Sequence, residues 1–236
     1  ARFRKDFLVK FLKYLEWYPE TLKHPFEELQ GNDVYIATSA DGKFRIYGWK
    51  MTMGSSWEFK NICQYEANGK VYSQLMEPLD EFAGGSLGYF DTIFQVDSKN
   101  GKYYMPRGFY HFDNPNTGIN IQAFTVEDGI LNDEFKLFEV REPMENGVYR
   151  KNFIEVSHST YTIPVVTMNG KEIDPGHPFK HVDIEFLPED LTFIVSSDMH
   201  TYDNDTIELS TWHYDTLVFN GEFFELVNPP ATEALP

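Results

Sequence analysis

The chain has 236 residues, of which 42% are hydrophobic and 24% charged, so it has the composition of a folded protein rather than a disordered one. Its net charge is −17, with +1 on residues 1–30 and −18 on residues 31–236. A surface this acidic repels phosphate backbones and anionic lipid headgroups, which disfavours nucleic acid as a partner. The sequence has no run of 18 apolar residues, so we expect no membrane insertion.

The first thirty residues predict a helix. Apolar residues recur at steps of three and four with basic residues between them, and they are Phe3, Phe7, Leu8, Phe11, Leu12, Leu15 and Tyr18. Pro19 has no backbone N–H to donate, so it ends or bends this helix, and a second short helix is expected at Phe26–Leu29, closed by Gly31. We expect residues 1–31 to be a helical lead-in packed on the following domain. A linker to an upstream domain is the alternative.

From about residue 33 the apolar residues follow period two, as in Val182, Ile184 and Phe186, which predicts strands with one buried face. Turn dipeptides punctuate these segments, because Asn or Asp followed by Gly accepts the positive φ angles of tight hairpins. Asn-Gly occurs at 68–69, 100–101, 146–147, 169–170 and 220–221, and Asp-Gly at 41–42 and 128–129. A further turn is expected at 188–190. The pattern predicts about twelve to fifteen strands joined mainly as hairpins.

The predicted fold class is therefore all-β, an antiparallel hairpin-rich meander with an N-terminal helix. Residues 33–75, 89–140 and 180–227 each resemble four strands joined by short turns, which is compatible with a propeller-like arrangement or with a sandwich or barrel of curled sheets. No Pro- or Ser-rich linker divides the chain, so we expect one all-β domain over residues 32–228 and a frayed tail at 229–236.

Motifs for catalysis or metal binding are weak. Gly84–Gly88 matches the five-residue nucleophile elbow of hydrolases, but Ser86 lacks the preceding strand and following helix that an elbow needs. His177 and His181 are separated by a proline, and the acidic segment around Asp203 matches no calcium loop. Cys63 is the sole cysteine and is expected to be buried in a strand. We predict no catalytic residues, no metal site and no cofactor.

A resemblance is carried by the segment Tyr35–Trp49, which follows Tyr18–Thr21 and Pro25–Phe26, and by the closing segment Phe219–Phe224. The chain resembles uncharacterised exported β-rich proteins of gut-dwelling Gram-negative anaerobes. That resemblance implies a periplasmic, cell-surface or secreted location, with the leader not present in this chain. It implies no activity.

Aromatic residues make up 17% of the chain and supply the candidate binding site. Exposed rings beside polar groups can stack on the apolar face of a sugar, whereas rings on both faces of a strand can equally be core. The candidate binding residues are Trp49, Trp57, Arg107, Tyr110, His111 and Trp212.

Three functional hypotheses follow. The first is a non-catalytic binding module of the bacterial envelope that engages a glycan or a protein through an aromatic face. The second is a carboxylate-based glycoside hydrolase, because two of the 37 acidic residues could form a catalytic pair across a cleft. The third is a structural part of a larger surface protein.

Overall fold

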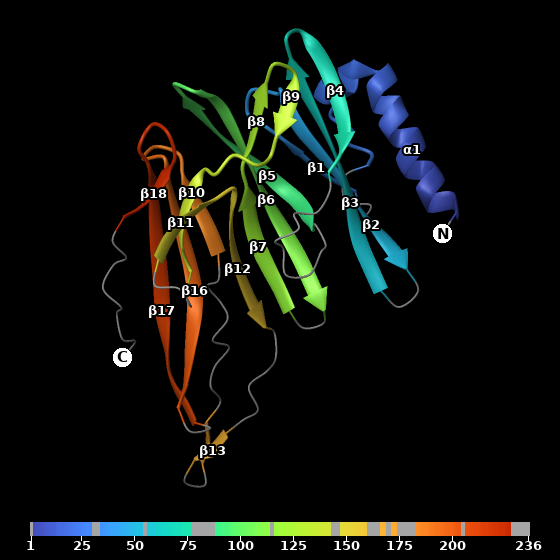
Figure 1. Cartoon of the computed structure of the whole chain (residues 1–236). Coiled ribbons are helices and arrows are strands. Elements are labelled where there is room, and N and C mark those ends of the chain that lie inside the picture. Colours follow the sequence, from blue (N-terminus) through green and yellow to red (C-terminus); the bar gives the residue numbers. More distant parts are fainter. Residues whose placement is uncertain are drawn as a thin grey trace.

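The computed structural model shows an all-β protein with a helix at its N-terminus, as the sequence predicts (Figure 1). The residues that it describes are 2–29, 34–53, 56–76, 88–113, 116–142, 147–159, 166–168, 171–173, 183–203 and 206–227. Eighteen strands lie in this part of the chain, more than the twelve to fifteen expected, because several short strands fall in segments without clear alternation.

Helix α1 (Arg2–Trp17) stops just before Pro19, and the 3-10 helix η1 (Pro19–Lys23) follows it. The expected second helix at Phe26–Leu29 is instead a single turn, closed by a hydrogen bond of 3.0 Å from the Leu29 N–H to the Phe26 carbonyl oxygen. Gly31, its expected cap, lies outside the described residues.

Sheet I is an antiparallel meander of β1 (Val34–Thr38), β2 (Phe44–Met53), β3 (Ser56–Ala67) and β4 (Lys70–Leu75). Both of its faces are covered, since successive side chains of a strand point to opposite faces. In β2, Phe44 and Ile46 pack toward sheet II, whereas Tyr47 packs with Leu15 of α1.

Sheet II is built around the long strand β6 (Gly101–Asp113). One side of β6 pairs with β5 (Tyr89–Ser98), and the other pairs with β7 (Asn116–Gln122) and β8 (Phe124–Glu127). The short strand β9 (Ile130–Asn132) extends the sheet beyond β8, and β12 (Phe153–Ser159) extends it beyond β7.

Sheet III has the strand order β11-β10-β18-β17-β16-β15. Its members are β10 (Phe138–Glu142), β11 (Gly147–Lys151), β15 (Asp183–Leu187), β16 (Thr192–Asp203), β17 (Thr206–Phe219) and β18 (Phe224–Val227). Strands β10 and β18 are parallel, whereas the other neighbours are antiparallel. A separate hairpin is formed by β13 (Val166–Met168) and β14 (Lys171–Ile173).

The turn dipeptides join strands as predicted. The pairs at 41–42, 68–69, 128–129 and 220–221 each lie between two consecutive strands that pair antiparallel, and Gly101 of the pair at 100–101 begins β6. Asn146 and the pair at 169–170 lie outside the described residues. Asn68 and Gly69 both have positive φ, at 52° and 72°, as a type I′ turn requires. The turn at 188–190 likewise connects β15 to β16.

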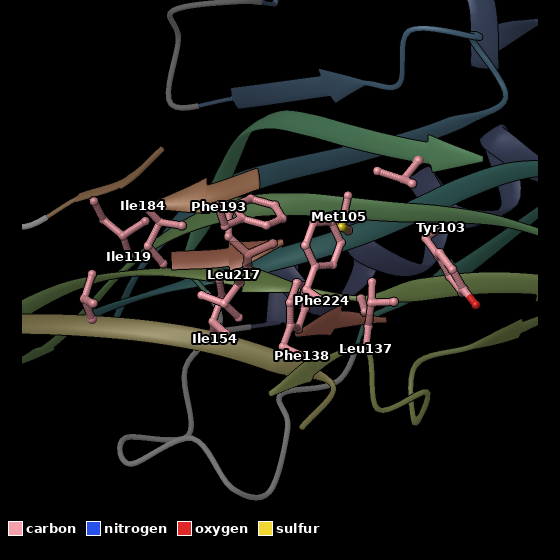
Figure 2. Close-up of a cluster of buried hydrophobic side chains, with 14 residues drawn as sticks. Tyr103, Met105, Ile119, Leu137, Phe138, Ile154, Ile184, Phe193, Leu217 and Phe224 are labelled. Atoms are coloured by element: carbon pink, nitrogen blue, oxygen red, sulfur yellow. The ribbon is translucent and has the colours of Figure 1, made fainter. Parts of the chain in front are cut away.

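The helix and the sheets are stacked in layers, which corresponds to the sandwich among the expected arrangements (Figure 1). Three buried clusters lie between α1 and sheet I, between sheets I and II, and between sheets II and III. Figure 2 shows the last of these, where Ile154 of sheet II packs with Phe193 and Phe224 of sheet III. Sheet II is therefore covered on both faces.

Candidate functional site

Trp49, the first of the predicted binding residues, is buried beneath the helix. Its side chain is 8% exposed, and Phe7 and Phe11 of α1 meet its ring edge-on at centroid distances of 5.5 and 5.9 Å. Trp49 therefore anchors α1 to sheet I and offers no free ring face to a ligand.

Tyr110 is also buried, at 2% exposure, between sheets I and II. Its ring covers Gly118 on β7, where an added Cβ atom would lie only 2.3 Å from the ring. Its hydroxyl donates a hydrogen bond of 3.2 Å to Glu155, and burial, reinforced by this carboxylate, raises the pKa of Tyr110. Tyr110, one of the many aromatic residues of β6, is therefore part of the buried core.

Arg107 is held in place by Asp91. Two hydrogen bonds of 3.1 and 2.7 Å join the guanidinium to the carboxylate, and the pairing raises the pKa of Arg107. The guanidinium also lies 5.4 Å from the centre of the Phe109 ring. This geometry ties β5 to β6.

The other three predicted residues are Trp57 in β3, His111 in β6 and Trp212 in β17, and their side chains lie outside the described part of the structure. These strands belong to sheets I, II and III respectively. For these three residues the predicted binding role stays a prediction.

Exposed aromatic rings are concentrated instead at the C-terminal end of α1. We call Tyr14, Trp17 and Tyr18 the aromatic face; they are 43%, 72% and 45% exposed. The Tyr14 and Tyr18 rings lie 4.7 Å apart, and the Tyr18 N–H donates to the Tyr14 carbonyl oxygen over 3.0 Å. The helical turn that carries the two rings thus continues through Tyr18.

Helix geometry explains why these rings face outward. Leu15 is fully buried against sheet I, and at about 100° per residue Trp17 lies about 160° round the helix from it. The sequence pattern placed Tyr18 and Phe7 in the packed stripe, but both are about half exposed. Phe7 nevertheless packs edge-on against Trp49 of sheet I, whereas the Tyr18 ring packs on Tyr14 of the same helix.

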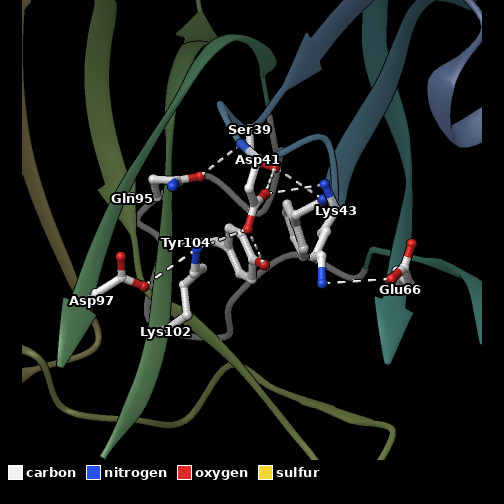
Figure 3. Close-up of polar contacts among 9 residues, drawn as sticks. Ser39, Asp41, Lys43, Glu66, Gln95, Asp97, Lys102 and Tyr104 are labelled. Carbon is white, nitrogen blue, oxygen red and sulfur yellow. Dashed lines mark hydrogen bonds and ion pairs between the residues drawn. The ribbon is translucent and has the colours of Figure 1, made fainter. Parts of the chain in front are cut away.

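A polar cleft of about 340 Å³ lies at the other side of sheet I, where its turns meet sheet II (Figure 3). Asp41, from the turn between β1 and β2, lies at its centre. One carboxylate oxygen accepts from the Ser39 hydroxyl at 2.7 Å, and the other accepts from Lys102 at 2.9 Å and Tyr104 at 3.2 Å. The Asp41 N–H in turn donates to Gln95 over 3.2 Å.

These contacts keep Asp41 ionised. Partial burial alone raises the pKa of the carboxyl group, but the hydrogen bonds from Ser39 and Lys102 outweigh it and lower the pKa. The same pairing with Asp41 raises the pKa of Lys102. A carboxylate engaged at both oxygens is suited to fixing geometry rather than to donating a proton.

The other wall of the cleft carries Glu66 at the end of β3. Glu66 pairs with Lys43 at 3.5 Å and with Lys23 of η1 at 3.8 Å. Asn68, Asp128 and Gly129 complete the rim. The lining therefore offers hydrogen-bond donors and acceptors of both charges, most of them already paired with each other.

The reactive groups that the sequence analysis singled out are buried or lie outside the described residues. Cys63 is fully buried, as predicted, and burial raises the pKa of its thiol to about 12. Ser86, His177 and His181 lie in segments outside the described part, as does the side chain of Asp203. Among the described residues no group of three or more His, Cys, Asp or Glu is placed to hold a metal ion.

No protein-family model matches the chain, and no curated protein matches it. In the described part of the chain, no helix combines the length and the apolar character needed to cross a membrane.

Proposed function

We propose that this protein is a non-catalytic binding module of the bacterial envelope, and that it engages a glycan through the aromatic face of α1. The observation that carries the proposal is the exposure of Trp17, which is 72% accessible beside the half-exposed pair Tyr14 and Tyr18. A Trp side chain exposed to solvent presents a large apolar surface that does not pack in the core. Contiguous groups of such exposed apolar side chains mark interaction sites.

The chemistry of these side chains favours a sugar over a purely apolar partner. Trp and Tyr combine a flat apolar ring with a polar N–H or O–H, so they can stack on a pyranose and also hydrogen-bond to its hydroxyls. The helix that carries them is fixed to sheet I by Leu15, so the rings are held on a rigid element. The envelope location is supported by the resemblance in segment Tyr35–Trp49 to exported proteins.

A carboxylate-based glycoside hydrolase is the second candidate, because Asp41, Glu66 and Asp128 all line the polar cleft. Such an enzyme needs one carboxyl group kept protonated as the acid. Asp41 does not suit the role of the catalytic acid, since its pKa is lowered and both of its carboxylate oxygens already accept hydrogen bonds. The cleft contacts support a role in joining two sheets more strongly than a role in catalysis.

The test is a screen of the intact chain against immobilised envelope, host and dietary glycans, followed by calorimetric titration of each hit. We expect Trp17→Ala to weaken binding by about tenfold or more, a loss of about 1.4 kcal/mol. Val148→Ala removes another exposed apolar side chain, on β11, which is 55% exposed, and should bind like the wild type.

The proposal fails if no glycan binds, or if Trp17→Ala binds each hit as tightly as the wild type. Incubating hits with the protein and measuring new reducing ends separates binding from hydrolysis. Cleavage that is lost in Asp41→Asn or Glu66→Gln would favour the second candidate.

A further inference from the structure

Two lysines lie beside the aromatic face. Lys10 is four residues before Tyr14, and Lys13 is four residues before Trp17, so each ammonium group lies one turn from a ring on the same side of the helix. Both lysines are exposed, and within the described residues neither has a carboxylate within ion-pair distance. Glu16 lies three residues after Lys13, on the adjacent turn, but no ion pair joins these two described side chains, and the side chain of Asp6, four residues before Lys10, lies outside the described part of the structure.

This arrangement differs from the rest of the molecule in charge. Residues 2–17 hold five basic and two acidic residues, a net charge of +3, whereas residues 31–236 have a net charge of −18. In residues 31–236, which we call the acidic body, the two lysines that line the polar cleft are paired with carboxylates. Lys43 pairs with Glu66, and Lys102 pairs with Asp41. The exposed Lys10 and Lys13 therefore supply cationic hydrogen-bond donors beside the aromatic face.

We infer that the glycan bound by the aromatic face is anionic, a chain bearing uronate carboxylates or sulfates. The inference rests on the proposed function and names its ligand class. Trp17 and the Tyr14–Tyr18 pair stack on sugar rings, and Lys10 and Lys13 pair with acidic groups along the chain. Lys13 is three positions after Lys10, so the two lysines lie on adjacent turns and can reach successive charges.

The charge distribution also distinguishes a glycan from an anionic bilayer. A bilayer is a broad surface, so docking through α1 would bring part of the acidic body within electrostatic range of the headgroups. A glycan chain is narrow and can contact the helix alone, with the remaining charges screened beyond about 8 Å at physiological salt. Leu8, Phe11, Leu12 and Leu15 pack on sheet I and are not free to insert into lipid.

The experiment compares two ligands that differ only in charge, oligogalacturonate and its fully methyl-esterified form, titrated against the intact chain. We expect the acid to bind at least tenfold more tightly than the ester, and Lys10→Gln with Lys13→Gln to remove most of that difference. The double variant should leave the affinity for the ester within about twofold of the wild type, because the rings are intact. Lys70→Gln with Lys99→Gln removes two exposed lysines elsewhere and should change neither affinity.

The outcomes separate the inference from the proposed function. If acid and ester bind equally well, and both need Trp17, the anionic ligand class is wrong while the glycan module stands. If neither binds and the wider glycan screen is also empty, the proposed function itself fails. Binding to vesicles of anionic lipid that is lost in the double variant, with no glycan binding, would overturn both. Circular dichroism and the melting temperature show whether each variant is folded.

Discussion

Gly118 and Tyr110 show how single residues set the packing of sheet II. The two residues are direct partners across β6 and β7, and the tyrosine ring lies over the glycine where any side chain would displace it. A similar pairing occurs at Gly108 and Asn120, where an added Cβ atom would lie 2.5 Å from the amide oxygen. At both places the side chain of one strand occupies the space over a glycine, which has no side chain, on the paired strand.

Replacing Gly118 by Ala should therefore destabilise the fold. The new methyl group would lie within 2.3 Å of Tyr110, a buried ring that cannot move without disturbing the cluster between sheets I and II. We expect a loss of about 1–3 kcal/mol in the free energy of unfolding, measured by urea denaturation. Tyr110→Phe keeps the ring and removes the hydroxyl with its bond to Glu155, so it should cost less. Equal stability of Gly118→Ala and wild type would contradict this packing.

At the scale of elements, the turn between β1 and β2 is connected to β5 and β6 through Asp41. The carboxylate is 17% exposed and accepts from Lys102 and Tyr104, so it joins sheet I to sheet II. The Asp-Gly dipeptide at 41–42 identified the turn from the sequence, but no pattern indicated that its Asp side chain reaches another sheet. The contact depends on how two distant segments stack, which local spacing does not encode.

Asp41→Asn should weaken this connection at neutral pH by about 1–2 kcal/mol, since a charge-assisted bond becomes a neutral one. A lowered pKa means that the ionised carboxylate adds stability above the unfolded-state value of about 3.9, and that this stability is lost as pH falls through the folded-state value. The difference between wild type and variant should therefore be full at pH 7 and shrink below about pH 4. Chemical denaturation at several pH values measures it.

The matched control for this prediction is Asp97→Asn. Asp97 pairs with the same Lys102 at 3.2 Å, but its side chain is 80% exposed, so its removal should cost less than about 0.5 kcal/mol. If Asp97→Asn were as destabilising as Asp41→Asn, or if the Asp41 effect did not change with pH, the connecting role of Asp41 would be wrong.

The sequence predicts the N-terminal helix and its end before Pro19, but it does not predict that Tyr18 is about half exposed. The periodicity of residues 3–18 indicates an apolar stripe, and the same residues could be packed or solvated depending on the width of the partner surface. The buried position of Trp49 follows from the same packing, because α1 covers the face of sheet I on which it lies. Sequence spacing therefore located the elements, but it did not show that two of the predicted binding residues, Trp49 and Tyr110, are buried.

Across the whole molecule, the sequence predicts the fold class and most connections, because turn dipeptides and alternation are local signals. The sequence does not predict the order of the strands in sheet III. There β10 and β18, more than eighty residues apart in the chain, pair in parallel, and this contact forms only when the buried clusters assemble. Which aromatic rings are exposed is likewise set by the faces that the layers leave uncovered.

The net charge of −17 makes a prediction at this scale. Repulsion among the acidic groups opposes the compact state, so raising NaCl from about 10 mM to about 150 mM, which shortens the screening length from about 30 to about 8 Å, should stabilise the fold. We expect the melting temperature at pH 7.5 to rise by several degrees. The effect should vanish near pH 4.7, the isoelectric point. A fall in melting temperature at pH 7.5 would mean that attractive ion pairs dominate.

The most direct test of the glycan-binding proposal is fluorine NMR of the intact chain with all four tryptophans replaced by 5-fluorotryptophan, assigned with Trp17→Phe. Adding oligogalacturonate should shift and broaden the Trp17 resonance and leave that of the buried Trp49 nearly unchanged. If the Trp17 resonance stays where it is, while the ligand binds elsewhere or does not bind at all, then the aromatic face of α1 is not the binding site.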